Sequence, residues 1–233
     1  MSTITAASTS GTIRSNASTA AASFADQFDV SRNKDSGSSQ FLDLSDTSDL
    51  VQTGRFGARG GGADTAQIFR AFYAFDVSSI TGTVSSVVLK LKGSTSGYAS
   101  NTTCSFIIIK ASKPSTSSNL VASDFDAIPG FTDDASMSGN VTDYSSEVTS
   151  LTSTTDYTEI TLNSTARSDV QSLSDFIIAV VDHDRDYSRS TTGLSSAGTI
   201  LSHNFDGVPD TKPPQIVVTE AATGYTHNVL GVA

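Results

Sequence analysis

Three carboxylates alternate with other residues in the segment DHDRD, at Asp182, Asp184 and Asp186. Calcium prefers several hard oxygen ligands spaced through a tight turn, so these residues are candidate ligands of a structural calcium ion. The segment lacks the central glycine and the distal glutamate of an EF-hand loop, and Arg185 would repel a cation. A solvated loop after a buried strand is therefore the favoured interpretation. We expect no cofactor other than this calcium.

Hydrolytic chemistry needs combinations of side chains that this sequence does not present. A nucleophilic serine requires a histidine that a carboxylate orients, and no Gly-x-Ser-x-Gly motif frames a serine in this chain. A glycosidase requires two carboxylates across a cleft. The only glutamates are Glu147, Glu159 and Glu220, and Glu159 alternates with apolar residues of a predicted strand, so it should point to solvent. We expect that the protein is not an enzyme.

The glycine-rich segment RFGARGGG, residues 55–62, is similar to a phosphate-binding loop in composition only. It lacks the Lys-Ser or Lys-Thr ending and the following helix of a P-loop. A turn before a strand is the better interpretation, because glycine adopts positive φ at little cost. Arg55 and Arg59 of this segment are candidates for contacts with acidic groups of a neighbouring subunit.

The elements that would position these residues are mainly strands. In residues 68–92, IFRAFYAFDVSSITGTVSSVVLKLK, apolar side chains recur at every second position on both sides of a polar turn. This alternation predicts two strands, each buried on one face only. The predicted buried faces consist of Phe69, Ala71, Tyr73, Phe75 and Val77 in the first strand and Val87, Leu89 and Leu91 in the second.

Further strands are predicted at residues 103–111, 158–162, 175–182, 199–205 and 215–219, with one short helix at 164–173. The segment 175–182 is the most continuously apolar, so it should be central in a sheet. We predict an all-β fold, an antiparallel β-sandwich. Its core should include Phe75, Leu89, Leu91, Ile178 and Val180.

Composition and charge limit the classes of function. Ser and Thr make up 70 of the 233 residues and 16% of residues are charged, which suits strands and turns better than long helices. The net charge of −10 argues against nucleic-acid binding, because a phosphate-binding surface needs clustered Lys and Arg. No apolar run has membrane-spanning length, so we expect no membrane insertion. The first residues lack the features of a secretory signal.

The chain divides into three parts by composition. Residues 1–23 are rich in Ser, Thr and Ala, which predicts an extended N-terminal arm that orders only against a partner. Residues 24–220 contain the predicted strands and form a single sandwich domain. Residues 221–233 are a short tail whose apolar side chains have no sheet to join, so we expect them to dock on another subunit. These side chains are Tyr225, Val229, Leu230 and Val232.

Two segments resemble a known family. The first is the aromatic strand that ends in Phe-Asp, followed by Ser-Ser-Ile, a turn and Val-Val-Leu-Lys-Leu; the second is DTKPPQIVVTE, residues 210–220. Both are similar to segments of DNRLRE-type domains, jelly-roll modules akin to carbohydrate-binding modules. The resemblance implies a jelly-roll topology. Such modules occur in bacterial surface proteins and in structural proteins of tailed bacteriophages.

Two functions agree with these features. The first is a structural protein of a tailed-phage virion, a capsid decoration, head-fibre or tail-appendage protein that is assembled in the host cytoplasm and exposed on the particle. Its expected partners are other virion proteins and further copies of itself. The alternative is a carbohydrate-binding module for cell-surface glycans, in which exposed aromatic rings stack on sugars. Tyr98, Tyr144 and Tyr187 lie in predicted loops and are the candidate platform.

Overall fold

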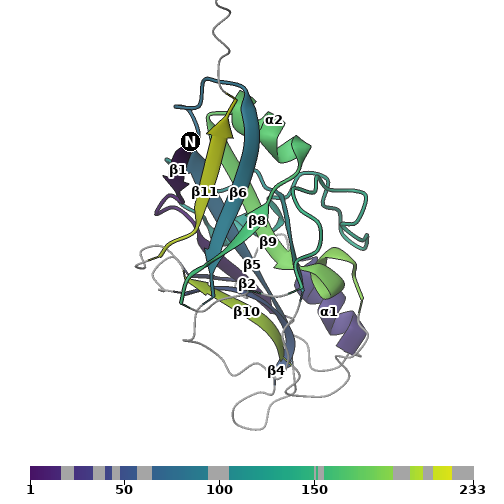
Figure 1. Cartoon of the computed structure of the whole chain (residues 1–233). Helices are drawn as coiled ribbons and strands as arrows, with labels where there is room; N and C mark the ends of the chain where they lie inside the picture. Colours follow the sequence, from purple (N-terminus) through teal and green to yellow (C-terminus); the bar gives the residue numbers. More distant parts are fainter. Residues whose placement is uncertain are drawn as a thin grey trace, which may run out of the picture.

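The computed structural model describes residues 1–16, 24–33, 40–43, 48–56, 65–93, 105–149, 151, 155–190, 200–206 and 212–221. In this part of the chain, the strands form two antiparallel sheets that pack face to face (Figure 1). The predicted all-β sandwich is confirmed. Two helices accompany the sheets, α1 (Phe24–Arg32) and α2 (Ser164–Ser172), and no helix among the described residues has the length and apolarity to cross a membrane.

The smaller sheet has the strand order β1 (Ser2–Thr5), β11 (Gln215–Glu220), β6 (Val84–Lys92) and β8 (Tyr157–Thr161). The larger sheet has the order β10 (Ile200–Asp206), β4 (Ser48–Phe56), β5 (Thr65–Asp76), β2 (Gly11–Asn16) and β3 (Gln40–Asp43). The larger sheet also contains β9 (Asp175–Asp182), which pairs with both β5 and β7 (Phe106–Lys110).

The long strand β5 organises the larger sheet. Its first half pairs with β4, at Gln52↔Phe69, and its second half pairs with β9, at Ala71↔Val180. Because β2 pairs with residues 67–72 across both halves, β4 and β9 must follow each other along the opposite edge of β5. The sheet therefore forks at the middle of β5, and β9 and β7 form one branch of it.

The main core lies between the two sheets. The side chains predicted for it are all fully buried there: Phe75, Leu89, Leu91, Ile178 and Val180. Strand β6 shows the predicted alternation, with Val87 and Leu89 buried and Val88 half-buried. Helix α2 closes one end of this core with Ala166 and Val170, and it begins where Asn163 accepts hydrogen bonds from the backbone N–H groups of the first turn.

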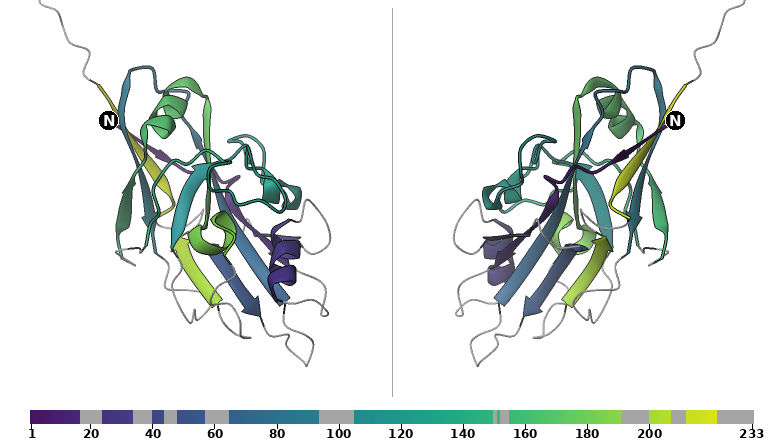
Figure 2. Two further views of the ribbon diagram at one scale, coloured as in Figure 1. Left: turned by 90° about the vertical axis from the view of Figure 1, so that its right-hand side faces the viewer. Right: turned by 90° about the vertical axis from the view of Figure 1, so that its left-hand side faces the viewer.

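A second core covers the outer face of the larger sheet, which was predicted to be solvent-exposed. Figure 2 shows α1 and the loop after β7 on this face, opposite the smaller sheet. The buried side chains here include Ile13, Ile68 and Phe72 from the sheet, Phe28 from α1 and Phe125 from the loop. Strand β5 is thus buried on both faces, and this explains why IFRAFYAF is almost continuously apolar.

The N-terminal residues differ from the predicted arm. Ser2–Thr5 is the edge strand β1 of the smaller sheet, and Gly11–Asn16 is β2, an interior strand of the larger sheet between β5 and β3. Thr and Ile favour strands, and the small polar side chains of Thr12 and Ser15 fit a buried position. The prediction of an N-terminal arm from the polar composition of these residues was therefore wrong for residues 2–5 and 11–16. Residues 17–23 lie outside the described part of the chain.

Candidate functional site

The candidate site surrounds the turn that follows β9. Residues His183–Tyr187 form one turn of π-helix, which we call the π-turn. The carboxylate of Asp182 fixes its start by accepting a hydrogen bond of 2.7 Å from the backbone N–H of Arg185, and the N–H of Ser188 closes it on the carbonyl of His183. Asp186 and Tyr187 are buried, whereas Asp184 is exposed. The π-turn therefore has an inner and an outer side.

On the inner side, Asp186 forms a buried bidentate ion pair with Arg70 of β5. Arg70 Nε and Nη2 donate to the two carboxylate oxygens at 2.7 and 2.9 Å. Burial acts to lower the pKa of Arg70, but the charges and hydrogen bonds of Asp186 and Asp126 together outweigh it, so the pKa is raised and Arg70 stays charged. The buried guanidinium is tolerated because its charge is balanced by a carboxylate, and both carboxylate oxygens accept hydrogen bonds from it.

The same guanidinium also holds the loop after β7. Arg70 Nη1 donates to the carbonyl of Phe125 at 2.7 Å and to Asp126 Oδ1 at 2.8 Å, and its Cζ lies 3.9 Å from the centroid of the Phe125 ring. Arg70 thus connects the larger sheet, the π-turn and the loop in one network.

Helix α1 joins this network through its last residue. Arg32 Nε donates to the backbone carbonyl of Asp186 at 3.0 Å, and burial lowers the pKa of Arg32. The ring of Phe131 lies 4.9 Å from Arg32 Cζ and 4.7 Å from Arg70 Cζ. The two guanidinium groups are therefore separated by Asp186 and by an aromatic ring, which attracts both.

The predicted calcium ligands do not converge. Asp186 is paired with Arg70, Asp182 is buried and caps the π-turn, and Asp184 lies on the outer side. Burial raises the pKa of Asp182 to about 7, against the lowering effect of its hydrogen bond from Arg185. Residues two positions apart share a face in a strand but not in a helical turn. The alternating carboxylates of DHDRD therefore stop sharing a face where β9 ends and the π-turn begins. These three carboxylates therefore do not form a common calcium site in this structure.

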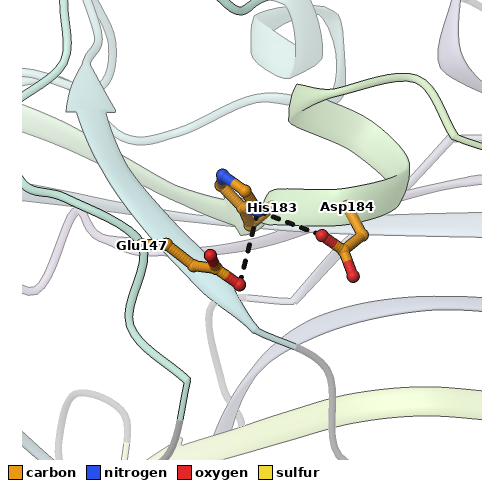
Figure 3. Close-up of side chains that lie close together, drawn as sticks. All are labelled: Glu147, His183 and Asp184. Atoms are coloured by element: carbon orange, nitrogen blue, oxygen red, sulfur yellow. Dashed lines mark hydrogen bonds and ion pairs between the residues drawn. The ribbon is translucent and has the colours of Figure 1, made fainter.

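On the outer side, His183 and Asp184 meet Glu147, which comes from the segment before the bridge between Val148 and Phe106 (Figure 3). His183 Nδ1 lies 3.1 Å from Asp184 Oδ1 and 3.5 Å from Glu147 Oε1. The imidazole ring stacks on Tyr187, with 5.4 Å between centroids. We call these three residues the outer cluster.

Strand β7 explains why the outer cluster forms. The backbone of Phe106 pairs with Val148 on one side and with Asp182 on the other, and the N–H of His183 donates to the carbonyl of Ser105. Glu147 and His183 therefore flank the start of the same strand. Sequence reasoning identified Glu147 only as one of three glutamates, because no local signal connects two residues that are far apart in the chain.

Chemically, the outer cluster fits cation binding better than hydrolysis. A carboxylate beside a histidine orients a general base in many hydrolases. Among the described residues, however, no serine, threonine or cysteine is hydrogen-bonded to the His183 ring, whose polar contacts are with Asp184 and Glu147. One imidazole nitrogen and two carboxylates facing each other are groups that attract a proton or a metal ion.

The candidate glycan platform is wrong for the two tyrosines that are described. Tyr144 is completely buried, its ring lies 5.1 Å from that of Phe176, and its hydroxyl donates to Asp169. Tyr187 is 5% exposed and donates to Asp143 at 2.8 Å. Neither ring has a face available to a sugar. Tyr98 lies outside the described residues.

The candidate interface residues stay predictions. Arg55 lies in β4, where the backbone is described and the side chain is not. Arg59 and the tail residues Tyr225, Val229, Leu230 and Val232 lie outside the described part of the chain.

Comparisons with known proteins assign no family. No family model matches the chain, and a search of curated proteins finds no match either.

Proposed function

We propose that this chain is a structural subunit of a tailed-phage virion, a capsid decoration, head-fibre or tail-appendage protein that binds neighbouring virion subunits. The main support for the proposal is that its buried charged residues connect separate elements of the fold. Arg70, Arg32 and Asp186 connect the larger sheet, α1 and the loop after β7 into one body. Such a network favours a fixed shape, which a subunit of a symmetric particle requires.

Strand order supports the jelly-roll part of the proposal. From β5 to β9 the chain alternates between the larger and the smaller sheet with each successive strand, and the first and last strands, β1 and β11, pair with each other. Two sheets built by such crossing connections are typical of jelly rolls. The resemblance of residues 68–92 and 210–220 to jelly-roll modules of phage structural proteins points to the same class.

The burial of Tyr144 and Tyr187 supports the structural function over the glycan-binding alternative. Both rings were needed for the sugar platform, and both are used to pack the interior instead. We therefore advance no glycan-binding function.

The C-terminal tail is the proposed contact with neighbouring subunits. Strand β11 is already paired on both sides, by β1 and β6, and the N–H of Ala221 donates to the carbonyl of Thr83 just beyond the end of β11. Strand β11 itself therefore has no unpaired edge. Each buried Leu or Val of the tail would contribute about 1.5–3 kcal/mol to an interface, and several copies would add through avidity.

Removal of the tail tests this proposal. Deletion of residues 224–233 should leave the melting temperature of the sandwich unchanged and should abolish or strongly reduce incorporation into particles, measured by co-sedimentation. Leu230→Ser should weaken incorporation, whereas the matched change Leu173→Ser, at an apolar side chain that is 40% exposed on the sandwich, should not. Unchanged incorporation of the truncated protein would exclude the tail as the anchor.

A further inference from the structure

We propose that the outer cluster, Glu147, His183 and Asp184, binds one divalent first-row transition-metal ion of the Zn²⁺ type. The site shares only Asp184 with the three-aspartate calcium hypothesis, and it does not depend on the proposed virion function.

The separations of the ligand atoms fit a metal ion. Ligand atoms about 2.0–2.2 Å from a metal, at tetrahedral or octahedral angles, are about 3.0–3.5 Å from one another. His183 Nδ1 lies 3.1 Å from Asp184 Oδ1 and 3.5 Å from Glu147 Oε1. The ligand atoms of all three residues lie within 4.8 Å of one another. Binding would require the carboxylate oxygens of Glu147 and Asp184 to approach each other, which the 40% exposed side chain of Glu147 leaves room for.

The histidine ligand is held in place before any ion binds. Its ring stacks on Tyr187, and the Tyr187 hydroxyl is fixed by Asp143 Oδ2 at 2.8 Å. The backbone N–H of His183 is fixed on the carbonyl of Ser105 at 2.9 Å. A ligand whose ring is oriented by neighbouring groups loses little conformational entropy on binding, and metal-binding histidines are commonly fixed in this way.

Charge and ligand type select the class of ion. Two carboxylates around a neutral imidazole carry about two negative charges, which a divalent cation balances. Calcium takes six to eight oxygen ligands, whereas imidazole nitrogen suits zinc, cobalt and nickel. Arg185 does not compete for the carboxylates, because its polar side-chain contact in this region is with Ser190, 3.5 Å from Nη1 to Oγ. Because the side chains of Glu147 and Asp184 are 40% and 53% exposed, water could complete the coordination.

A proton on His183 Nδ1 is the competing explanation of the same geometry, since an imidazolium would also attract both carboxylates. The two explanations differ in whether Zn²⁺ binds at neutral pH.

The test is isothermal titration of the full chain with Zn²⁺ at pH 7.5 in a buffer without chelators, together with the visible absorption of bound Co²⁺. We expect one ion per chain. His183→Gln should reduce the affinity at least about 100-fold, and Glu147→Gln and Asp184→Asn about 10-fold or more each. Glu159→Gln makes the same charge change on the exposed face of β8 and should leave the affinity within about twofold.

Three results would overturn the proposal. The first is no one-to-one binding of Zn²⁺ by the wild-type chain, even if His183→Gln lowers the melting temperature, because this is what an imidazolium alone predicts. The second is Zn²⁺ binding that His183→Gln and Glu147→Gln leave unchanged. The third is Ca²⁺ binding at the same site with equal affinity, which would make the imidazole irrelevant. Melting curves of each variant establish that the folded protein was measured.

Discussion

Arg70 sits at a position that a charged residue occupies only when its charge is balanced. It lies on the outer face of β5 among apolar side chains, and its guanidinium is 0% exposed. The desolvation cost of two buried charges is large, and the pair is favourable only because each of the three guanidinium nitrogens donates at least one hydrogen bond, four in all. Removal of one partner should therefore cost far more than the loss of an exposed ion pair.

We predict that Asp186→Asn lowers the free energy of unfolding by about 3–5 kcal/mol, because it leaves Arg70 buried with an incomplete set of anionic partners. The exposed pair Lys90–Glu159, with Nζ and Oε1 2.7 Å apart, supplies the control. Glu159→Gln should cost less than about 1 kcal/mol. Urea unfolding of both variants measures the difference. Equal small losses would mean that the buried pair does not hold the loop and α1 on the sheet.

Asp126, the second carboxylate on Arg70, predicts a pH dependence. Burial raises the pKa of Asp126 to about 6, although Arg70 Nη1 lies 2.8 Å away. The pKa of Asp126 in the folded protein is above its value in the unfolded chain. The protonated carboxyl therefore makes its full contribution to stability below about pH 4, and this contribution is lost as the pH rises through about 6. Relative to Asp126→Asn, wild type should lose about 1–3 kcal/mol between pH 4 and pH 7. A relative stability that increases with pH over this range would contradict the prediction.

At the scale of elements, the sequence pattern predicts a strand and its buried face correctly where the other face of the strand is exposed to solvent. Val87, Leu89 and Leu91 of β6 alternate with exposed or half-buried residues, and this strand was predicted with its correct face. For β5 the predicted buried face is correct, but the expectation of an uncovered second face is wrong, because α1 and a loop cover that face. The pattern failed for β2 because Gly, Thr and Ser compose an interior strand whose partners, β3 and β5, are not local in sequence.

Leu89→Ala tests the assignment of β6. Leu89 is fully buried between the sheets, so the substitution should cost about 2–5 kcal/mol through lost burial and a cavity. Val88→Ala, one position along the same strand on the half-buried face, should cost about 1 kcal/mol or less. Chemical denaturation distinguishes them. A loss below about 0.5 kcal/mol at Leu89 would contradict the packing of the sheets.

The N-terminal strands make a prediction opposite to that of an arm. Because β2 is paired on both sides, the amides of residues 11–16 should exchange with solvent slowly in the isolated protein. Ile13→Ala should cost about 2–4 kcal/mol, since Ile13 is buried in the second core. Hydrogen exchange measured by mass spectrometry gives the first result. Rapid exchange of this segment in the free protein would instead support the hypothesis of an N-terminal arm.

At the scale of the whole molecule, the site was accessible to sequence reasoning only in part. The segment DHDRD was correctly singled out, but its chemistry depends on partners that the sequence does not place: Arg70 on the inner side and Glu147 on the outer side. Those contacts arise because β5, β7 and β9 are neighbours in one sheet. Long-range pairing, which local periodicity does not encode, decides which side chains meet.

The molecule that results is a sandwich with two cores, and a network of buried charges joins the larger sheet to α1 and the loop on its outer face. A net charge of −10 opposes non-specific association of copies, so the proposed assembly would depend on specific contacts. This agrees with a subunit that is incorporated into a particle through defined segments.

The most direct measurement is the copy number of the chain in gradient-purified phage particles, determined by quantitative mass spectrometry against the major coat protein. A virion structural protein should be present in several copies per particle, in a fixed ratio that persists through repeated gradients. A chain that is absent from the particles and remains in the free protein of the lysate would contradict the proposed function.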